Sequence, residues 1–218
     1  MSFILHIETA TKSCSVALSS NGKLLALKEL NSLEYGHAER LTVFVQNVLD
    51  EAQIALKDLS AVSVSSGPGS YTGLRIGVST AKGFCYALNI PLIAIDSLYS
   101  LAEQAFIIHP GKNLCAMIDA RRMEVFSAIY NDSLQLIKPI SADIIDEKSY
   151  SEFGSFVYFG DGAHKLEDSW GLRELEIDRS IFSSAIGQIK EANRKYVAQE
   201  FQDVAYFEPF YLKDFVSK

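Results

Sequence analysis

Val-Ser-Ser-Gly-Pro-Gly-Ser-Tyr-Thr-Gly-Leu-Arg-Ile-Gly is the sequence of residues 64–77, and it decides the fold of the first part of the chain. The residues just before the turn, 59–66, are apolar in a pattern typical of a half-buried strand. A glycine-proline-glycine turn at residues 67–69 interrupts that pattern. We expect a helix to begin near Ser70 or Thr72. The stretch therefore predicts a strand, a tight turn and a helix in immediate succession.

Small residues recur along the predicted helix, because Gly73, Gly77 and Ala81 are spaced four residues apart and share one face. A glycine inside a helix costs about 1 kcal/mol relative to alanine, so a close contact with another helix or backbone must compensate. One interpretation is a turn packed within the protein itself. Another is an anion site at the helix N-terminus, although the spacing fits neither a P-loop nor a dinucleotide fingerprint.

Composition sets outer bounds on the kind of protein. The chain has 218 residues, of which 48% are hydrophobic, and this is enough for a sizeable core. The three cysteines, Cys14, Cys85 and Cys115, are widely spaced in apolar stretches, so we expect neither a disulfide framework nor a zinc site. We find no signal-peptide pattern and no apolar run long enough to span a bilayer. These features predict a cytoplasmic protein with no membrane association.

The net charge of −7 argues against a nucleic-acid platform that acts alone. Arg121-Arg122 is the only pair of adjacent arginines in the sequence. Asp119 and Glu124 flank this pair, and we expect the four side chains to form a structural ion-pair cluster rather than an acid/base pair. Any contact with nucleic acid is therefore expected inside a complex whose other members supply positive charge.

The order of predicted elements is that of an α/β protein. In the first half we expect strands at residues 3–8, 13–19, 24–30, 59–66 and 91–95, and helices at residues 37–56, 71–88 and 97–104. Asn21-Gly22 is a strong hairpin signal between the second and third strands. After a break at residues 109–112, we expect strands at residues 114–118, 124–130, 134–137 and 156–159, and a helix at residues 181–198.

The stretch 65–77 is accompanied by five further blocks in a fixed order: Ile4-Leu5-His6-Ile7-Glu8-Thr9-Ala10-Thr11, Cys14-Ser15-Val16-Ala17-Leu18, His37-Ala38-Glu39-Arg40-Leu41, Asp119-Ala120-Arg121-Arg122-Met123-Glu124-Val125 and Pro209-Phe210-Tyr211-Leu212. Together these blocks resemble the TsaB (YeaZ) family across nearly the whole chain. That family is the bacterial partner subunit in threonylcarbamoyladenosine modification of tRNA.

The resemblance implies an actin-like, sugar-kinase-like (ASKHA) fold, in which two related α/β lobes each contain a mixed sheet. We expect residues 1–106 to form the first lobe, with the partner-binding helices, and residues 107–205 to form the second. Residues 206–218, which include an aromatic group near the end of the chain, are expected to return to the first lobe.

The resemblance also implies a non-catalytic role, in support of the paralogue TsaD. TsaD transfers a threonylcarbamoyl group from an adenylate donor to the adenosine next to the anticodon, and the ATPase TsaE joins the same assembly. This chain would then contact tRNA only indirectly. The helices that open at His37 and near Tyr71 would pair with TsaD, or with a second copy of this chain when it is alone. The expected interface residues are His37, Leu41, Val45, Val48, Gly73, Leu74, Gly77 and Ala81.

No catalytic, metal-binding or cofactor-binding residue is expected in this chain by itself. The catalytic paralogue has two histidines one helical turn apart, whereas this chain has His37 and then Leu41. Glu8 stands where the family commonly has aspartate, which weakens a case for nucleotide binding by this chain alone. ATP or ADP would then bind only at the junction of a complex. The alternative is an actin-fold ATPase or kinase, or a peptidase-like enzyme, that acts alone.

Overall fold

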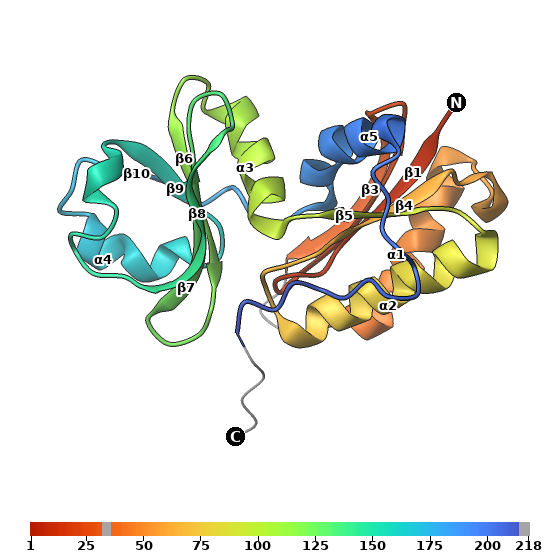
Figure 1. The fold of residues 1–218 in the computed structure, drawn as a ribbon, viewed down its shortest axis with the longest axis horizontal. Helices are drawn as coiled ribbons and strands as arrows, with labels where there is room; N and C mark the ends of the chain where they lie inside the picture. The colour runs from red at the N-terminus through yellow and green to blue at the C-terminus, as the bar shows by residue number, and fades with distance from the viewer. Residues whose placement is uncertain (32–35, 214–218) are drawn as a thin grey trace.

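Two five-stranded sheets form the frame of two lobes in the computed structural model, which describes residues 1–31 and 36–213 (Figure 1). The first sheet has the order β3-β2-β1-β4-β5. Its strands are β1 (Phe3–Glu8), β2 (Ser13–Ser20), β3 (Lys23–Asn31), β4 (Ala61–Ser65) and β5 (Leu92–Ile95). Strand β1 runs antiparallel to β2 and parallel to β4, so the sheet is mixed as predicted. The β2–β3 hairpin turns at Asn21 and Gly22, both with positive φ.

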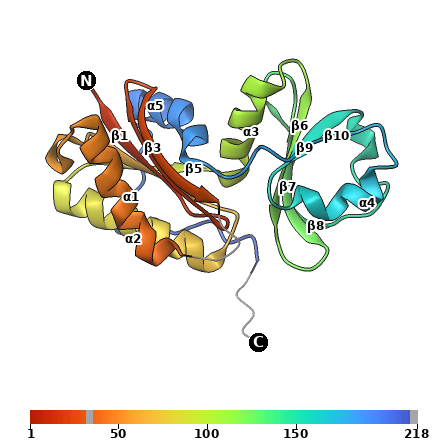
Figure 2. The ribbon, with the colours of Figure 1, turned by 180° about the vertical axis from the view of Figure 1, so that it is seen from behind.

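Helices cover both faces of the first sheet. Helices α1 (His37–Ala52) and α2 (Tyr71–Leu88) lie side by side on one face, and the 3₁₀ helix η4 (Ala185–Gln188) and α5 (Ile189–Ala198) lie on the other (Figure 2). Helix α1 ends four residues earlier than predicted because Gln53 adopts a left-handed conformation, and a short 3₁₀ helix, η1 (Leu56–Asp58), follows. None of the helices in the described ranges has the length and apolar character needed to cross a membrane.

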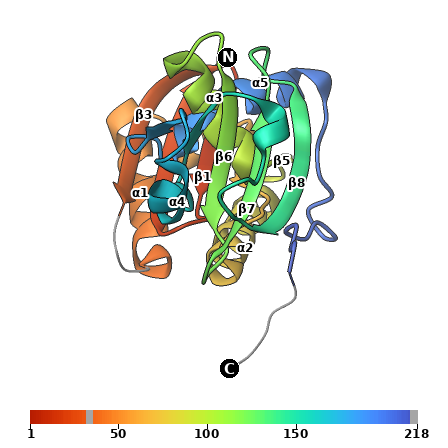
Figure 3. The same ribbon diagram turned by 90° about the vertical axis from the view of Figure 1, so that its left-hand side faces the viewer.

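The second sheet has the order β10-β9-β6-β7-β8 and is also mixed. Its strands are β6 (Asn113–Asp119), β7 (Glu124–Tyr130), β8 (Leu136–Ile144), β9 (Phe156–Phe159) and β10 (Glu176–Asp178). Figure 3 shows this lobe in front, with the short helix α4 (Glu167–Trp170) on its outer face. Trp170 is fully buried there among Tyr150, Phe156 and Tyr158. The short 3₁₀ helices η2 (Ser151–Phe153) and η3 (Ala163–Leu166) complete this layer.

The lobe boundaries differ from the expected ones. Helix α3 (Ser97–Ile108) places Leu98 and Leu101 in one apolar cluster with β6, β7 and β9, so it belongs to the second lobe. Helix α5 instead packs Ala192 against Ile4 and Ile93 of the first sheet. The chain therefore crosses between the lobes after β5 and again before η4. Both assignments depend on which sheet receives a helix's apolar face, and periodicity along the chain does not specify that.

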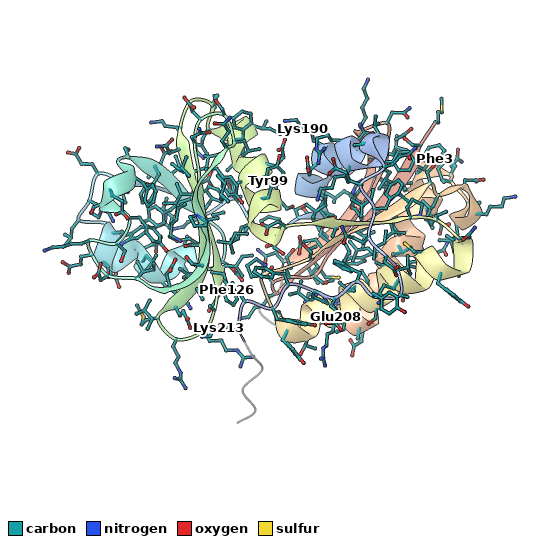
Figure 4. All side chains as sticks on the ribbon, in the orientation of Figure 1. Phe3, Tyr99, Phe126, Lys190, Glu208 and Lys213 are labelled. Atoms are coloured by element: carbon teal, nitrogen blue, oxygen red, sulfur yellow. The ribbon has the colours of Figure 1, made fainter. Side chains whose placement is uncertain are left out.

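The lobes touch where α3 meets η4 and α5. Lys190 Nζ lies 2.8 Å from Glu103 Oε1, and the Tyr99 hydroxyl donates to Glu103 Oε2 at 3.0 Å. Figure 4 shows Tyr99 and Lys190 facing each other across this junction. The buried carboxylate of Glu103 is thereby engaged from both lobes.

The last described residues form a strap, residues 202–213, along α2. The Gln202 N–H donates to the Leu92 carbonyl at 2.9 Å, and the Phe210 N–H donates to the Ser66 carbonyl at 2.7 Å. The strap then reaches the second lobe, where Leu212 packs on the α3 cluster and Lys213 pairs with Glu124. The strap therefore contacts both lobes rather than the first alone. The rest of the predicted terminal segment, residues 214–218, lies outside the described ranges.

Candidate functional site

The residues predicted to contact a partner line the core of the first lobe instead. His37, Leu41, Val45, Val48, Leu74 and Ala81 are each at most 3% exposed, and Gly73 and Gly77 are also buried. The inward faces of α1 and α2 carry these residues against the first sheet. As contact residues they are wrong, because a partner cannot reach them without opening the lobe.

The compensating contact for the helical glycines is internal. A Cβ atom on Gly73 would lie 2.1 Å from the Thr9 carbonyl oxygen, and one on Gly77 would lie 2.2 Å from Thr9 Oγ1. The Thr9 hydroxyl donates to the Gly73 carbonyl at 2.8 Å. The two glycines therefore let α2 approach the end of β1 closely. Of the alternatives raised by the sequence, internal packing is the correct one.

The glycine-proline turn does not fit a bound phosphate. The Gly67 N–H donates to Ser97 Oγ at 3.2 Å, and the Gly73 N–H donates to Ser70 Oγ at 3.2 Å. A Cβ atom on Gly67 would lie 2.4 Å from the Phe210 carbonyl oxygen, so the strap fills the space beside it. Donors and volume that an anion would need are already used by this chain.

His37 connects the start of α1 to the β1–β2 turn. Its Nε2 lies 2.9 Å from the Thr11 carbonyl oxygen, and burial lowers the pKa of its imidazole. Leu41, one turn later, is in the apolar core. Within residues 1–31 and 36–213, no group of three or more His, Cys, Asp or Glu side chains is arranged to hold a metal ion.

Glu8 ends β1 as a buried carboxyl group. Its Oε1 accepts the Ala10 N–H at 2.7 Å, and its Oε2 lies 3.5 Å from Gln188 Nε2. Burial raises the pKa of Glu8 to about 7, although these hydrogen bonds act in the opposite direction. The group is held by the first lobe and η4 rather than presented to a ligand.

Replacement of Glu8 by glutamine is expected to remove a loss of stability at neutral pH. The ordinary pKa of 4.5 applies to the unfolded chain, so between pH 4.5 and 7 the folded state holds a proton that the unfolded state has lost. The contribution of Glu8 to the free energy of unfolding of the parent therefore falls as the pH rises through this window, by at most about 3 kcal/mol. Measured by urea unfolding, the stability of Glu8→Gln relative to the parent should rise with pH by this amount, whereas Glu39→Gln, at an exposed position, should follow the parent. A Glu8→Gln profile parallel to that of the parent would contradict the assignment.

The exposed parts of α1 and α2 lie on the opposite side from the predicted residues. We call them the outer helical face: Ala38, Glu39, Thr42, Val43, Gln46, Asn47, Asp50 and Glu51 on α1, and Thr72, Arg75, Ser79, Gly83, Tyr86 and Ala87 on α2. Among the six residues on α2, Arg75 alone is charged, and Val43 and Tyr86 are 52% and 86% exposed. The same helical periodicity could have located this face, half a turn away from the apolar stripe.

The predicted ion-pair cluster at the β6–β7 turn has different partners. Asp119 pairs with Lys165 of η3, and Glu124 pairs with Lys213 of the strap. In the described part of the chain, neither Arg121 nor Arg122 forms an ion pair or a side-chain hydrogen bond, and both are exposed. The expectation that the arginines pair with their sequence neighbours is therefore wrong.

Two mixed-sheet lobes with helices on both faces define a protein of the actin-like, sugar-kinase-like class. The activator of 2-hydroxyisocaproyl-CoA dehydratase from Clostridium difficile shares this fold, with a TM-score of 0.55 and 9% identity over 92% of this chain and 98% of that one. YeaZ from Pseudomonas aeruginosa is more similar, with a TM-score of 0.83 and 28% identity over 97% of this chain and 100% of that one.

Sequence comparison identifies the family within this class. The model of the family described as "TsaD: tRNA N6-adenosine threonylcarbamoyltransferase" matches residues 32–214. The Escherichia coli relative named "tRNA threonylcarbamoyladenosine biosynthesis protein TsaB" is 30% identical over 98% of this chain and 96% of its own length. The chain belongs to the TsaB (YeaZ) family.

Proposed function

We propose that this chain is a non-catalytic subunit in the synthesis of threonylcarbamoyladenosine on tRNA, and that it supports a TsaD-type subunit by binding it. The names of its relatives support the pathway. The observation that carries the proposed role is the outer helical face, an exposed surface on two neighbouring helices whose α2 part has a single charged residue, Arg75 (Figure 2). Depletion of charged residues is typical of the centre of a protein interface.

The burial and contacts of the potentially reactive side chains support a non-catalytic role for this chain. His37 has no histidine one turn away, and its Nε2 contacts the Thr11 carbonyl. Glu8 is enclosed by the first lobe and η4. All three cysteines are buried, and burial raises the pKa of Cys14 and Cys85 to about 11, so their thiols stay protonated and unreactive near neutral pH.

The shape of the outer helical face supports packing against a second pair of helices. In the described part of the chain, no neighbouring atom lies within 4 Å of the position that a Cβ on Gly83 would take, so the surface of α2 is low at this residue. Ser79 and Thr72 continue this low strip along the helix. Small residues let a partner helix approach closely, and two helices from each subunit would form a four-helix arrangement. The same face would join two copies of the chain when TsaD is absent.

The proposal places the remaining partners around that junction. TsaE would join the assembly of this chain and TsaD in the cytoplasm. Because the glycine turn of this chain is filled by its own backbone, ATP or ADP would bind at the junction of the subunits and not to this chain alone.

Bulky substitutions on the outer helical face are expected to abolish assembly and leave the fold intact. Ser79→Trp and Gly83→Trp add an indole to the low strip, where it faces solvent in the free chain and blocks the approach of a partner helix. We expect binding to the cognate TsaD-type subunit to weaken by roughly 100-fold or more, which is about 3 kcal/mol. Light scattering of the mixed proteins and calorimetric titration measure this effect.

Val197→Trp is the matched control, because Val197 is 74% exposed on α5, on the opposite face of the first sheet. It should assemble like the parent. If the three variants all assemble normally, or if Val197→Trp alone fails, the interface lies elsewhere and the proposed use of the outer helical face is wrong.

A further inference from the structure

The β6–β7 turn concentrates positive charge in an otherwise acidic protein. Arg121 and Arg122 are exposed at its tip, and among the described residues they have no ion-pair partner. The net charge of the whole chain is −7, so two adjacent exposed guanidinium groups form a local positive charge on an acidic protein. Guanidinium groups bind phosphate oxygens through pairs of parallel hydrogen bonds.

The backbone of the turn is held in an uncommon conformation. Arg121 and Arg122 have φ values of 71° and 51°, in the left-handed region that residues with a Cβ rarely adopt. Each such residue costs of order 1 kcal/mol, and the structure persists only where its surroundings enforce it. Here the Asp119 carboxylate accepts the Arg121 N–H, and the Ala120 N–H donates to the Glu124 carbonyl at 3.1 Å. These hydrogen bonds therefore fix the backbone of the turn that exposes the two consecutive arginines.

Two lysines that are distant in sequence pair with the carboxylates that would otherwise neutralise the arginines. Lys165 comes from η3 and pairs with Asp119, and its amine also donates to the Glu124 carbonyl at 3.0 Å. Lys213 comes from the strap and pairs with Glu124. Figure 4 shows Lys213 at the same end of the second lobe as Phe126 of β7. Asp161 also belongs to this cluster, because its carboxylate accepts the Asp119 N–H at 3.0 Å. The turn and the residues that hold it therefore carry four cations and three carboxylates, so the local charge is positive.

We propose that the β6–β7 turn binds the phosphate backbone of the RNA substrate, with Arg121 and Arg122 as the contact residues. This inference rests on the proposed function, which places the chain in an assembly that acts on tRNA. It revises the expectation that tRNA is reached only indirectly. RNA is a dense polyanion surrounded by condensed cations, and arginines that bind its phosphates release those cations into solution, which favours binding. The contact positions the RNA and carries no sequence preference.

The test measures binding of an unmodified tRNA transcript to the assembled complex of this chain and its TsaD-type subunit at several salt concentrations. The double variant Arg121→Ala with Arg122→Ala removes the two charges and keeps a Cβ at both positions. We expect tRNA binding to weaken roughly tenfold, and the slope of log affinity against log salt to decrease by about 1.5. The double variant with glutamine at both positions keeps side-chain length and should behave in the same way.

Lys57→Ala with Lys112→Ala is the matched control, because both lysines are exposed, lie away from the turn and change the net charge by the same amount. Equal weakening in this control would show a general charge effect and overturn the proposal. Loss of TsaD binding with unchanged tRNA affinity would make the turn a protein contact and also overturn it. If the parent chain does not assemble with TsaD, the proposed function fails separately. The same variants then decide the RNA contact on the chain alone at low salt, where an unchanged affinity overturns it.

Discussion

Gly77→Trp is expected to unfold the first lobe rather than to disrupt only its assembly. The first side-chain carbon at this position would already lie 2.2 Å from Thr9 Oγ1, far inside van der Waals contact. Helix α2 cannot move away, because Leu74, Val78 and Ala81 on the same side are buried in the lobe. Overpacking of this kind costs 1–3 kcal/mol or more for a few methylene groups, and an indole is much larger. Because the net stability of a domain is about 5–15 kcal/mol, the variant should not reach the native fold.

Circular dichroism and thermal melting of the purified variant measure this outcome. Gly83→Trp, on the same helix but with open space at the Cβ position, is the matched control and should melt like the parent. Gly77→Ala tests the geometry with a single carbon and should lower the melting temperature. A Gly77→Trp protein that melts like the parent and fails only to bind its partner would contradict internal packing and place Gly77 in the partner interface.

Acid is expected to destabilise the first lobe through His6. This histidine is fully buried on β1, and its ring nitrogens each lie 2.7 Å from a serine hydroxyl, Ser63 on one side and Ser19 on the other. Burial lowers the pKa of His6 from 6.5 to about 3. Between these values the unfolded chain binds a proton and the folded chain does not, so the free energy of unfolding falls as the pH falls. The full effect is at most about 5 kcal/mol.

The titration of Glu8 partly offsets this acid-induced loss of stability. From pH 6.5 down to 4.5 the folded state gains stability as Glu8 takes up its proton, and the two slopes oppose each other. The parent should therefore change little in this window and lose stability steeply below pH 4.5. Glu8→Gln removes the opposing term, so urea unfolding of that variant should show the fall from pH 6.5 downward.

His6→Gln supplies the decisive comparison, because glutamine can hydrogen-bond to both serines and does not titrate. The variant should be less stable than the parent near pH 7, since its shape fits the site less well, and should have a flatter acid profile. His164→Gln, at an exposed position in the second lobe, is the control and should retain the acid slope of the parent. An unchanged acid slope in His6→Gln would assign the acid sensitivity to other groups.

Short-range chemistry predicted much of the fold. The turn at residues 67–69 and the helix Tyr71–Leu88 occur where the sequence predicts them, because glycine, proline and the Ser70 cap act within a few residues. Strand β1 also has its predicted bounds. Strand β8 was predicted to end at residue 137, but it continues to Ile144. Its register against β7 shifts near Lys138, and long-range pairing with that strand maintains it past Pro139.

The candidate site was likewise predictable only in part from the sequence. Helical periodicity correctly grouped Gly73, Gly77 and Ala81 on one face, but a small-residue face packs equally well on a sheet or on a partner helix. The choice depends on Thr9, which lies 64 residues before Gly73 and fills the space beside both glycines. Among the described residues, Arg121 and Arg122 likewise have no ion-pair partner because Lys165 and Lys213, which are distant in sequence, pair with the neighbouring carboxylates.

The order of elements, the tight turns and the family are written in the amino-acid sequence, because each depends on residues close together or on a recognisable succession of motifs. The direction in which each helix presents its apolar face, the lobe that receives α3 and α5, and the partner of each charge emerged only from the folded chain. Packing and ion pairing are decided by distances between side chains that are far apart in sequence, and helical or strand periodicity contains no information about those distances.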